Sequence, residues 1–484
     1  METKKLFLST LAFLLVIPML SACGGGTPNQ ESKRVLRIGV MSGGGNEQNI
    51  RQQYTDIYEY MNPNMTIEII PAVDYSKYNY MIEEDEKERP DAVEEMKKLM
   101  TGSNPVDIVL MDKDAFQVYT EEGQLKLLDS FMKKDSLDTS DFVPSIMEHL
   151  KAMGNGNLYG LAPTFYTSAI FYNKTLFKEA GVELPKDNMT WDEAFDLARR
   201  VTKGEGADRK FGFNFSNYWS DNYYHIFNYA KPLQLRLYDD KAEKMMVNSP
   251  QWEKVFDSFL KLEKEHIFPV QTDRGEADRP YNPIDRDPFL SGKVAMIVNY
   301  YDYTAELLEV SKYAGNLKNF KMPDWDVVTI PHHVEAPEVN SWMEVNTILG
   351  INNQAQNPDD AWNFIRFIHS EDWAKLKSRS SRQLVTRQTY IKPQDGMNYN
   401  IQAFYAMKPD NSKEPKITRQ KRNLWVINDA GSSLYEKAKD GKLSTADMLK
   451  KWEAVGSTLL QAIKNNPNGN INEDETIRKA IYGE

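Results

Sequence analysis

Residues 158–193 constrain the fold of this 484-residue chain more than any other stretch. They contain two short apolar runs, a helix-like segment, a loop and the start of another helix. The apolar runs cover residues 158–163 and 168–173, and the second is rich in Ile, Phe and Tyr, which strands favour. Closely spaced strands and helices of this kind indicate an α/β protein.

The helices of this stretch carry clear start and stop signals. Residues 175–180 predict a short helix that ends at Gly181, which can adopt the left-handed conformation, and Pro185 prevents its continuation. Thr190 and Glu193 have the spacing of a capping box, which predicts a helix over residues 191–203. Between the two apolar runs, residues 164–166 are expected to be a connection between two halves of the molecule, with Tyr166 placed to touch a ligand.

The same stretch resembles the family 1 extracellular solute-binding proteins of bacterial ABC importers, the group that includes maltose-binding protein. The matching phrases are Leu158-Tyr159-Gly160-Leu161-Ala162-Pro163, in which Ala162 is an insertion, Phe171-Tyr172-Asn173-Lys174, Phe177, Ala180-Gly181, Pro185 and Thr190-Trp191-Asp192-Glu193. The resemblance implies a type II periplasmic-binding-protein-like fold, in which two lobes, each a mixed sheet flanked by helices, are joined by crossing hinge strands. It assigns residues 35–163 plus 332–385 to an N-terminal lobe and residues 164–331 plus 386–484 to a C-terminal lobe.

Later segments extend the resemblance. Residues 287–301, 325–331 and 358–368 are similar to three further phrases of the family, and residues 384–387 resemble its Leu-Pro-x-Arg return with Val385 in place of proline. The chain departs from the family before Trp342, where Asn340 and Ser341 stand in place of two glycines.

The N-terminus predicts export. Lys4 and Lys5 precede the apolar residues 6–20, a run that has the length of a signal-peptide core. The run is followed by Cys23, in a segment that resembles the lipobox of bacterial lipoproteins. This resemblance implies a signal peptide over 1–22, a lipid on Cys23 and a membrane-anchored tether over 23–34. A chance cysteine in a secretory signal is the alternative. Cys23 is the only cysteine, so no intrachain disulfide is possible.

Charge and composition narrow the class of ligand. The formal net charge is −11, which argues against nucleic acid as a partner. Aromatic residues make up 11% of the chain, and they are the side chains that stack on flat ligand faces.

The first half of the chain places one candidate ligand residue. Residues 35–41, 65–70 and 106–112 are predicted strands, and the glycines at 43–45 do not form a complete phosphate-binding motif. Asp112 follows the third strand, at the edge of an α/β sheet where ligands bind. The alternative role for Asp112 is to cap the next helix.

The second half supplies the remaining candidates. Trp219 and Asn222 belong to a cluster of aromatic and amide residues, Asn299 and Tyr301 stand near the end of a predicted strand, and Trp342 and Arg387 lie in segments that resemble the family. Trp219 could instead be a buried structural tryptophan. Arg387 could bind ligand oxygens or form a salt bridge between the lobes.

Together these features predict a lipid-anchored protein outside the cytoplasm that captures a carbohydrate, most simply an oligosaccharide, and delivers it to an ABC permease. The prediction is of a monomer without cofactor, metal or enzymatic activity. The segment 466–475 loosely resembles a calcium loop, but Lys464 occupies the position of its first acidic ligand. HExxH and GxSxG motifs are absent. A glycoside hydrolase, which needs only two facing carboxylates, is the main alternative, and a structural surface lipoprotein is the third.

Overall fold

The computed structural model describes residues 33–43, 46–76, 90–218, 222–269, 283–317, 320–379, 382–394, 396–467 and 475–482. The predicted signal peptide, Cys23, Trp219 and most of the 466–475 loop lie outside these residues. Within the described ranges no helix has the length and apolar character needed to cross a bilayer.

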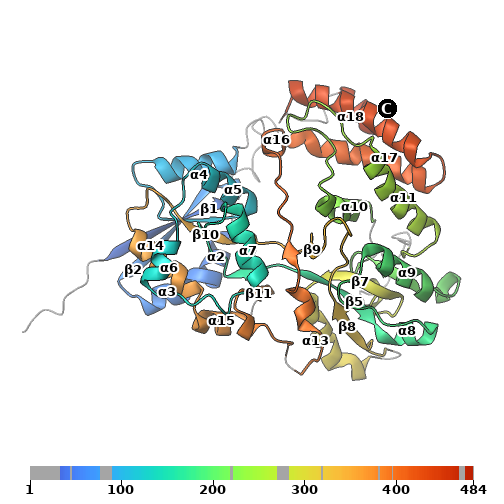
Figure 1. The fold of residues 1–484 in the computed structure, drawn as a ribbon, viewed down its shortest axis with the longest axis horizontal. Helices are drawn as coiled ribbons and strands as arrows, with labels where there is room; N and C mark the ends of the chain where they lie inside the picture. The colour runs from blue at the N-terminus through green and yellow to red at the C-terminus, as the bar shows by residue number, and fades with distance from the viewer. Residues whose placement is uncertain are drawn as a thin grey trace, which may run out of the picture.

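Two α/β lobes lie side by side, each built on a four-stranded sheet (Figure 1). The N-terminal lobe has the strand order β10-β3-β1-β2, in which β1 is parallel to β2 and β3 and β10 is antiparallel to β3. Its strands are β1 (Arg34–Ser42), β2 (Met65–Val73), β3 (Ile108–Met111) and β10 (Ile348–Ile351). The predicted mixed sheet is therefore confirmed in this lobe.

The C-terminal lobe has the strand order β6-β7-β5-β8, with β5 antiparallel to both neighbours and β6 parallel to β7. Its strands are β5 (Ser168–Asn173), β6 (Phe211–Asn214), β7 (Val294–Tyr300) and β8 (Trp325–Val328). This sheet is also mixed, so both lobes have the predicted α/β architecture.

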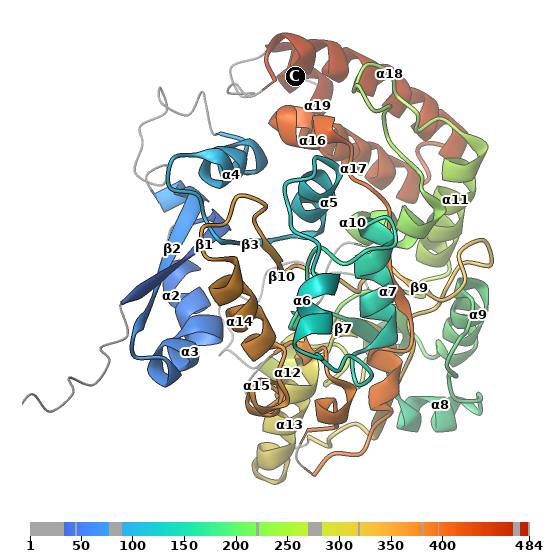
Figure 2. The same cartoon turned by 60° about the vertical axis from the view of Figure 1, so that its left-hand side comes forward.

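Helices flank both sheets (Figures 1 and 2). Those of the N-terminal lobe are α2 (Asn46–Ile50), the π-helical turn η1 (Arg51–Thr55), α3 (Asp56–Met61), α4 (Ala92–Thr101), α5 (Lys113–Glu121), α6 (Asp129–Lys134), α7 (Pro144–Met153), α14 (Pro358–Ile368) and α15 (Glu371–Lys377). Those of the C-terminal lobe are α8 (Lys174–Ala180), α9 (Trp191–Val201), α10 (Tyr223–Ala230), α11 (Pro250–Lys264), α12 (Pro283–Arg286), α13 (Tyr303–Tyr313), α16 (Lys416–Gln420), α17 (Val426–Lys439), α18 (Thr445–Asn465) and α19 (Glu475–Tyr482).

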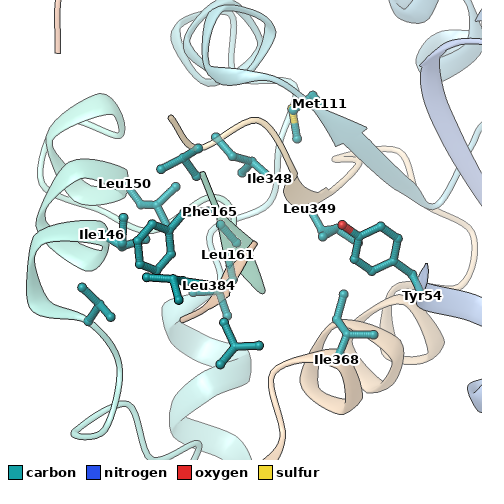
Figure 3. Close-up of a cluster of buried hydrophobic side chains, with 14 of the residues drawn as sticks. Tyr54, Met111, Ile146, Leu150, Leu161, Phe165, Ile348, Leu349, Ile368 and Leu384 are labelled. Atoms are coloured by element: carbon teal, nitrogen blue, oxygen red, sulfur yellow. The ribbon is translucent and has the colours of Figure 1, made fainter. Parts of the chain in front are cut away.

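The alternation of side chains along β5 divides the core of the C-terminal lobe. Ala169 and Phe171 pack into one buried cluster, whereas Ile170 and Tyr172 pack into a second, because successive side chains of a strand point to opposite faces. The first cluster also contains the core of the N-terminal lobe. Figure 3 shows its crossing region, where Phe165 and Leu384 point toward Ile146 and Leu150 of α7. Apolar packing thus continues from one lobe to the other.

Short strands carry the chain between the lobes. β4 (Thr164–Phe165) pairs antiparallel with β11 (Leu384–Val385), and β9 (Val339–Asn340) pairs in parallel with β12 (Lys408–Pro409). The connection expected at 164–166 is therefore partly a strand.

The local signals of residues 158–193 are mostly confirmed. Gly181 ends α8 with φ of 69°, and Thr190 and Glu193 form both hydrogen bonds of a capping box at the start of α9. The strand predicted over 158–163 is wrong. That segment has only an isolated bridge between Leu161 and Leu349, and a Cβ on Gly160 would lie 2.7 Å from Ile348 Cγ2, so the chain crosses β10 closely there without forming a strand.

Residues 408–416, which we name the strap, contact the N-terminal lobe although they follow β11 and fall in the range predicted for the C-terminal lobe. Lys408 pairs with Glu148 at 3.4 Å, Lys113 Nζ donates to the Ser412 carbonyl at 2.9 Å, and Lys413 pairs with Glu121. The chain then enters the helices α16 to α19 of the C-terminal lobe. The predicted lobe boundaries remain predictions, and the strap is a contact between lobes that they do not anticipate.

Gly212 tests the packing of α9 on the C-terminal sheet. A Cβ at this position would lie 2.0 Å from the carbonyl oxygen of Ala198, a backbone atom that cannot move away. We expect Gly212→Ala to lower the free energy of unfolding by about 3 kcal/mol, measured by urea denaturation. Gly315→Ala, where no atom lies within 4 Å, is the control and is expected to stay within about 0.5 kcal/mol of wild type. Equal stability of the two variants would contradict this packing.

Candidate functional site

Two crossing segments are bonded to each other at the floor of the space between the lobes. The Tyr166 amide donates to the Glu344 carbonyl at 2.9 Å, and the Glu344 amide donates to the Tyr166 carbonyl at the same distance. Tyr300, at the end of β7, lies near both residues, and Tyr166 and Tyr300 are each 37% exposed. Burial raises the pKa of Tyr300 to about 12, with the Glu344 carboxylate adding to the effect. The neutral Tyr300 hydroxyl can donate and accept hydrogen bonds.

The first cavity on this floor, which we name the aromatic pocket, has a volume of about 290 Å³. Its lining residues are Gln53, Tyr54, Thr164, Tyr166, Trp373, Lys377, Arg382 and Gln383. The rings of Tyr54 and Trp373 are stacked, with centroids 6.1 Å apart and an angle of 12° between planes. Lys377 Nζ lies 5.8 Å from the centroid of the Trp373 ring. The pocket thus combines flat apolar surface with amide, hydroxyl and cationic groups.

Tyr54 reaches this pocket from an unusual local structure. It lies in η1, the π-helical turn between α2 and α3, and such turns are frequent at functional sites. Figure 3 shows its ring beside the core residues Leu349 and Ile368. Burial raises the pKa of Tyr54, while interactions with Thr347 and Thr164 oppose the increase. Thr164 Oγ1 in turn donates to the Gln383 side chain. These bonds fix the polar groups around the pocket.

The second cavity, which we name the acidic pocket, has a volume of about 240 Å³. Its ionisable lining residues are Asp112, Lys113, Asp114, His149, Lys231, Glu344, Asp410 and Glu414. Lys231 follows α10 of the C-terminal lobe, whereas Asp112 and Asp114 stand at the carboxyl end of β3 in the N-terminal lobe. The pocket therefore lies between the lobes, and five carboxylates face two ammonium groups within it.

A larger cavity of about 650 Å³ lies elsewhere in the C-terminal lobe, beside Thr175 and Glu179 of α8. None of its lining residues belongs to the crossing segments. The described residues contain no group of three or more His, Cys, Asp or Glu side chains arranged to hold a metal ion. We therefore take the aromatic and acidic pockets as the candidate site.

Two of the predicted ligand residues line these pockets. Tyr166 lines the aromatic pocket and Asp112 lines the acidic pocket. Asp112 also caps α5, because its carboxylate accepts from the Ala115 amide at 2.8 Å. Asp112 therefore caps the helix, as the alternative interpretation expected, while its contact with a ligand remains a prediction.

Three other predicted residues are less exposed to solvent than Tyr166. Asn222 is 2% exposed and directly precedes α10. Asn299 pairs with Ala169 in the sheet, and its side-chain oxygen accepts from the Tyr300 amide at 2.9 Å. Tyr301 is buried, with its ring edge-on to Phe404 at 5.4 Å. In this conformation Tyr300, one residue away, is the ring that reaches the floor.

Trp342 and Arg387 are placed in structural surroundings. Trp342 is 4% exposed and packs against Trp191 at 5.8 Å and Phe215 at 6.1 Å. The guanidinium of Arg387 donates to the carbonyls of His369 and Asp138, and lies 4.7 Å from the Phe142 ring. Its carboxylate partner is Asp141 at 3.7 Å, so Arg387 forms a salt bridge, which the predicted boundaries would place between the two lobes, and its contact with a ligand remains a prediction.

Several site residues were missed by the sequence prediction. Tyr54, Trp373, Lys377, Arg382 and Glu344 are up to 328 positions apart in the sequence, and no local motif connects them. The one usable sequence signal was the predicted end of the β7 strand, which pointed to residues 299–301 but could not distinguish Tyr300 from its neighbours.

The comparisons with known proteins agree with this architecture. Residues 72–375 match the family model described as bacterial extracellular solute-binding protein. The chain belongs to this family. A putative binding protein of Brucella abortus is 23% identical over 323 residues, which cover 66% of this chain and 71% of that protein. A mannitol-binding protein of Pseudomonas aeruginosa is 22% identical over 177 residues, 37% of this chain and 39% of that protein.

Solved structures share the fold. A family 1 extracellular solute-binding protein of Alicyclobacillus acidocaldarius aligns with a TM-score of 0.61 at 17% identity, covering 90% of this chain and 100% of that chain. A sugar transporter of Rhizobium etli in an open conformation aligns with a TM-score of 0.58 at 19% identity, covering 89% and 99%. The two-lobed α/β fold predicted from the sequence is therefore confirmed, as is the family.

Buried histidines make stability depend on pH. Burial lowers the pKa of His149, which lines the acidic pocket, from its usual 6.5 to about 4. The folded protein then binds fewer protons than the unfolded chain, so this histidine contributes fully above pH 6.5 and its contribution is lost as pH falls toward 4. We expect His149→Gln to reduce the loss of unfolding free energy between pH 6.5 and 4 by up to about 3 kcal/mol relative to wild type.

The measurement is urea denaturation at a series of pH values. Gln retains a donor for the Asn411 side chain, which His149 Nδ1 contacts, so the fold is preserved. His266→Asn, at an exposed residue, is the matched control and should keep the wild-type dependence. The same dependence in His149→Gln as in wild type would contradict a neutral buried imidazole.

Proposed function

We propose that this solute-binding protein captures a saccharide between its lobes and delivers it to the permease of an ABC importer. The observation that supports this proposal is the aromatic pocket, where the exposed Tyr166 ring lies beside the side chains of Gln53, Thr164 and Gln383, and the buried Tyr54 and Trp373 rings complete the lining. Rings stack on the apolar faces of sugars, and amides and hydroxyls exchange hydrogen bonds with sugar hydroxyls.

Similar proteins support the choice of a sugar. A sugar-binding protein of Xanthomonas citri and a Listeria monocytogenes substrate-binding protein in complex with cycloalternan align with TM-scores of 0.57 and 0.51. Likeness at 14% and 17% identity extends to the fold, so the ligand of this chain is inferred from its own pockets.

The arrangement of the pockets favours an oligosaccharide over a monosaccharide. Tyr166 lines the aromatic pocket and Glu344 lines the acidic pocket, and the two residues are bonded directly to each other through their backbones. A ligand with more than one ring can occupy both cavities at once. Micromolar affinity requires about 8 kcal/mol, which a few stacked rings and several polar contacts can supply.

Binding rather than catalysis is the proposed role. The acidic pocket brings carboxylates together, as a glycoside hydrolase requires, but the family is one of solute-binding proteins. We further propose that the mature protein is monomeric. We also propose that it lies outside the cytoplasm and is held at the membrane by a lipid on Cys23, as the apolar N-terminus and its lipobox indicate.

The ligand is tested by a thermal-shift screen of mono- and oligosaccharides, since a ligand that binds only the folded state raises the melting temperature. We expect Tyr166→Ala and Tyr300→Ala each to weaken the binding of a hit by roughly tenfold, because each ring is exposed at the floor. Tyr60→Ala, at a residue of α3 that is 88% exposed, is the control and should bind like wild type. Mass spectrometry of the recovered sugar should show it unchanged, whereas cleavage products would establish the hydrolase.

The lipid anchor is tested in the producing bacterium by Cys23→Ala. We expect the wild-type chain to fractionate with membranes and the variant to be released, because the variant lacks the acceptor thiol. Equal membrane association of the two proteins would exclude Cys23 as the anchor.

A further inference from the structure

The two pockets of the candidate site differ in charge. The lining residues of the aromatic pocket include two positively charged side chains, Lys377 and Arg382, and no carboxylate. The acidic pocket has five carboxylates against two lysines, and its histidine, His149, is neutral at pH 7. A ligand that occupies both pockets therefore meets positive charge at one end and negative charge at the other.

The two cations lack close counter-charges. No carboxylate of the described residues lies within 4.0 Å of the Lys377 ammonium or the Arg382 guanidinium, although other lysines and arginines of the chain have such partners. Asp56 is the nearest acidic influence on Lys377, and Asp302 of the C-terminal lobe interacts electrostatically with Arg382. Both carboxylates act at longer range than an ion pair.

Lys377 is also partly removed from water. It ends α15, its Nζ donates to the Gln52 carbonyl at 3.2 Å, and burial lowers its pKa. An ammonium group that is desolvated without a paired carboxylate is stabilised by an incoming anion. Arg382 is exposed beside it and offers a planar guanidinium that can bind a carboxylate through two hydrogen bonds.

We propose that the captured saccharide is acidic and that its carboxylate, as in a uronic acid residue, binds in the aromatic pocket between Lys377 and Arg382. This inference rests on the proposed function. In this arrangement the ring of the uronic acid lies against Tyr166, and Thr164 and Gln383 form hydrogen bonds with its hydroxyl groups. The carboxylates of the acidic pocket repel a second anionic group, so they fix the direction in which the ligand lies.

The experiment uses the purified mature protein and a panel of oligosaccharides that carry a single uronic acid residue at one end of an otherwise neutral chain, such as aldobiouronic and aldotriouronic acids, each beside its neutral methyl ester. Binding is measured by calorimetry at low and high NaCl concentration. We expect one acid to bind at least tenfold more tightly than its ester, and this preference to shrink at high salt because charge is screened.

Two substitutions test whether Lys377 and Arg382 cause the preference for the acid over its ester. Lys377→Gln and Arg382→Gln should each reduce the ratio of the affinity for the acid to the affinity for its ester by about tenfold. Lys375→Gln, at an exposed residue of the same helix, is the matched control and should retain the preference. Circular dichroism and the melting temperature of each variant verify that it is folded.

The remaining outcomes separate this inference from the proposed function. Neutral sugars that bind as tightly as acidic ones, with no effect of either variant, overturn the acidic ligand and leave the saccharide receptor standing. Failure of every sugar to bind overturns both. Binding of inorganic phosphate or sulfate alone, with the same dependence on Lys377 and Arg382 and without any sugar binding, identifies a free anion as the ligand and also overturns the inference.

Discussion

The reciprocal backbone hydrogen bonds between Tyr166 and Glu344 hold the candidate site together. Each residue lies in a different crossing segment, and the pairing sets these segments side by side between the two sheets. The Tyr166 ring then lines one pocket and the Glu344 carboxylate lines the other. Because main-chain atoms make the bonds, the floor does not depend on the identity of either side chain. Evolution can therefore change the ligand of such a site without changing its framework.

The balance of charge and neutral polar groups decides what this site can hold. Aromatic rings and amides give affinity for sugars in general, since they contribute with little regard to charge. Charged side chains without close partners do discriminate between ligands, because a ligand of the wrong charge leaves these side chains desolvated and unpaired. Lys377 and Arg382 on one side and the carboxylates of the acidic pocket on the other thus contribute more to selectivity than to affinity.

The sequence predicted those parts of the fold that local signals determine. The β5 strand, the capping box of Thr190 and the left-handed Gly181 each depend on residues within a few positions, and each was placed correctly. The prediction of a strand over 158–163 was wrong, because apolar composition does not show whether a neighbouring strand pairs with the segment. In the structure that segment meets β10 through a single bridge at Leu161.

The site was less predictable because it is assembled from distant segments. Tyr54 and Trp373 stack although 319 positions separate them, and neither stands in a recognisable motif. Trp342 resembles a ligand-stacking residue by type, yet its ring packs with Trp191 and Phe215 in the core. At the end of β7, the turn of the chain brings Tyr300 rather than Tyr301 to the floor, and strand alternation gives no information beyond the last paired residue.

The strap has a mechanical consequence for the lobes. Its residues 408–416 are fastened to α5 and α7 of the N-terminal lobe through Lys413 and Lys408, and the chain continues without interruption into the C-terminal helices. It therefore joins the N-terminal lobe to the C-terminal helices at a place separate from the crossing strands β4 and β11. Separating the strap from the N-terminal lobe requires the loss of the ion pairs of Lys413 with Glu121 and of Lys408 with Glu148. Because the side chains of these ion pairs are exposed to solvent, salt weakens them and with them the contact of the strap with the N-terminal lobe.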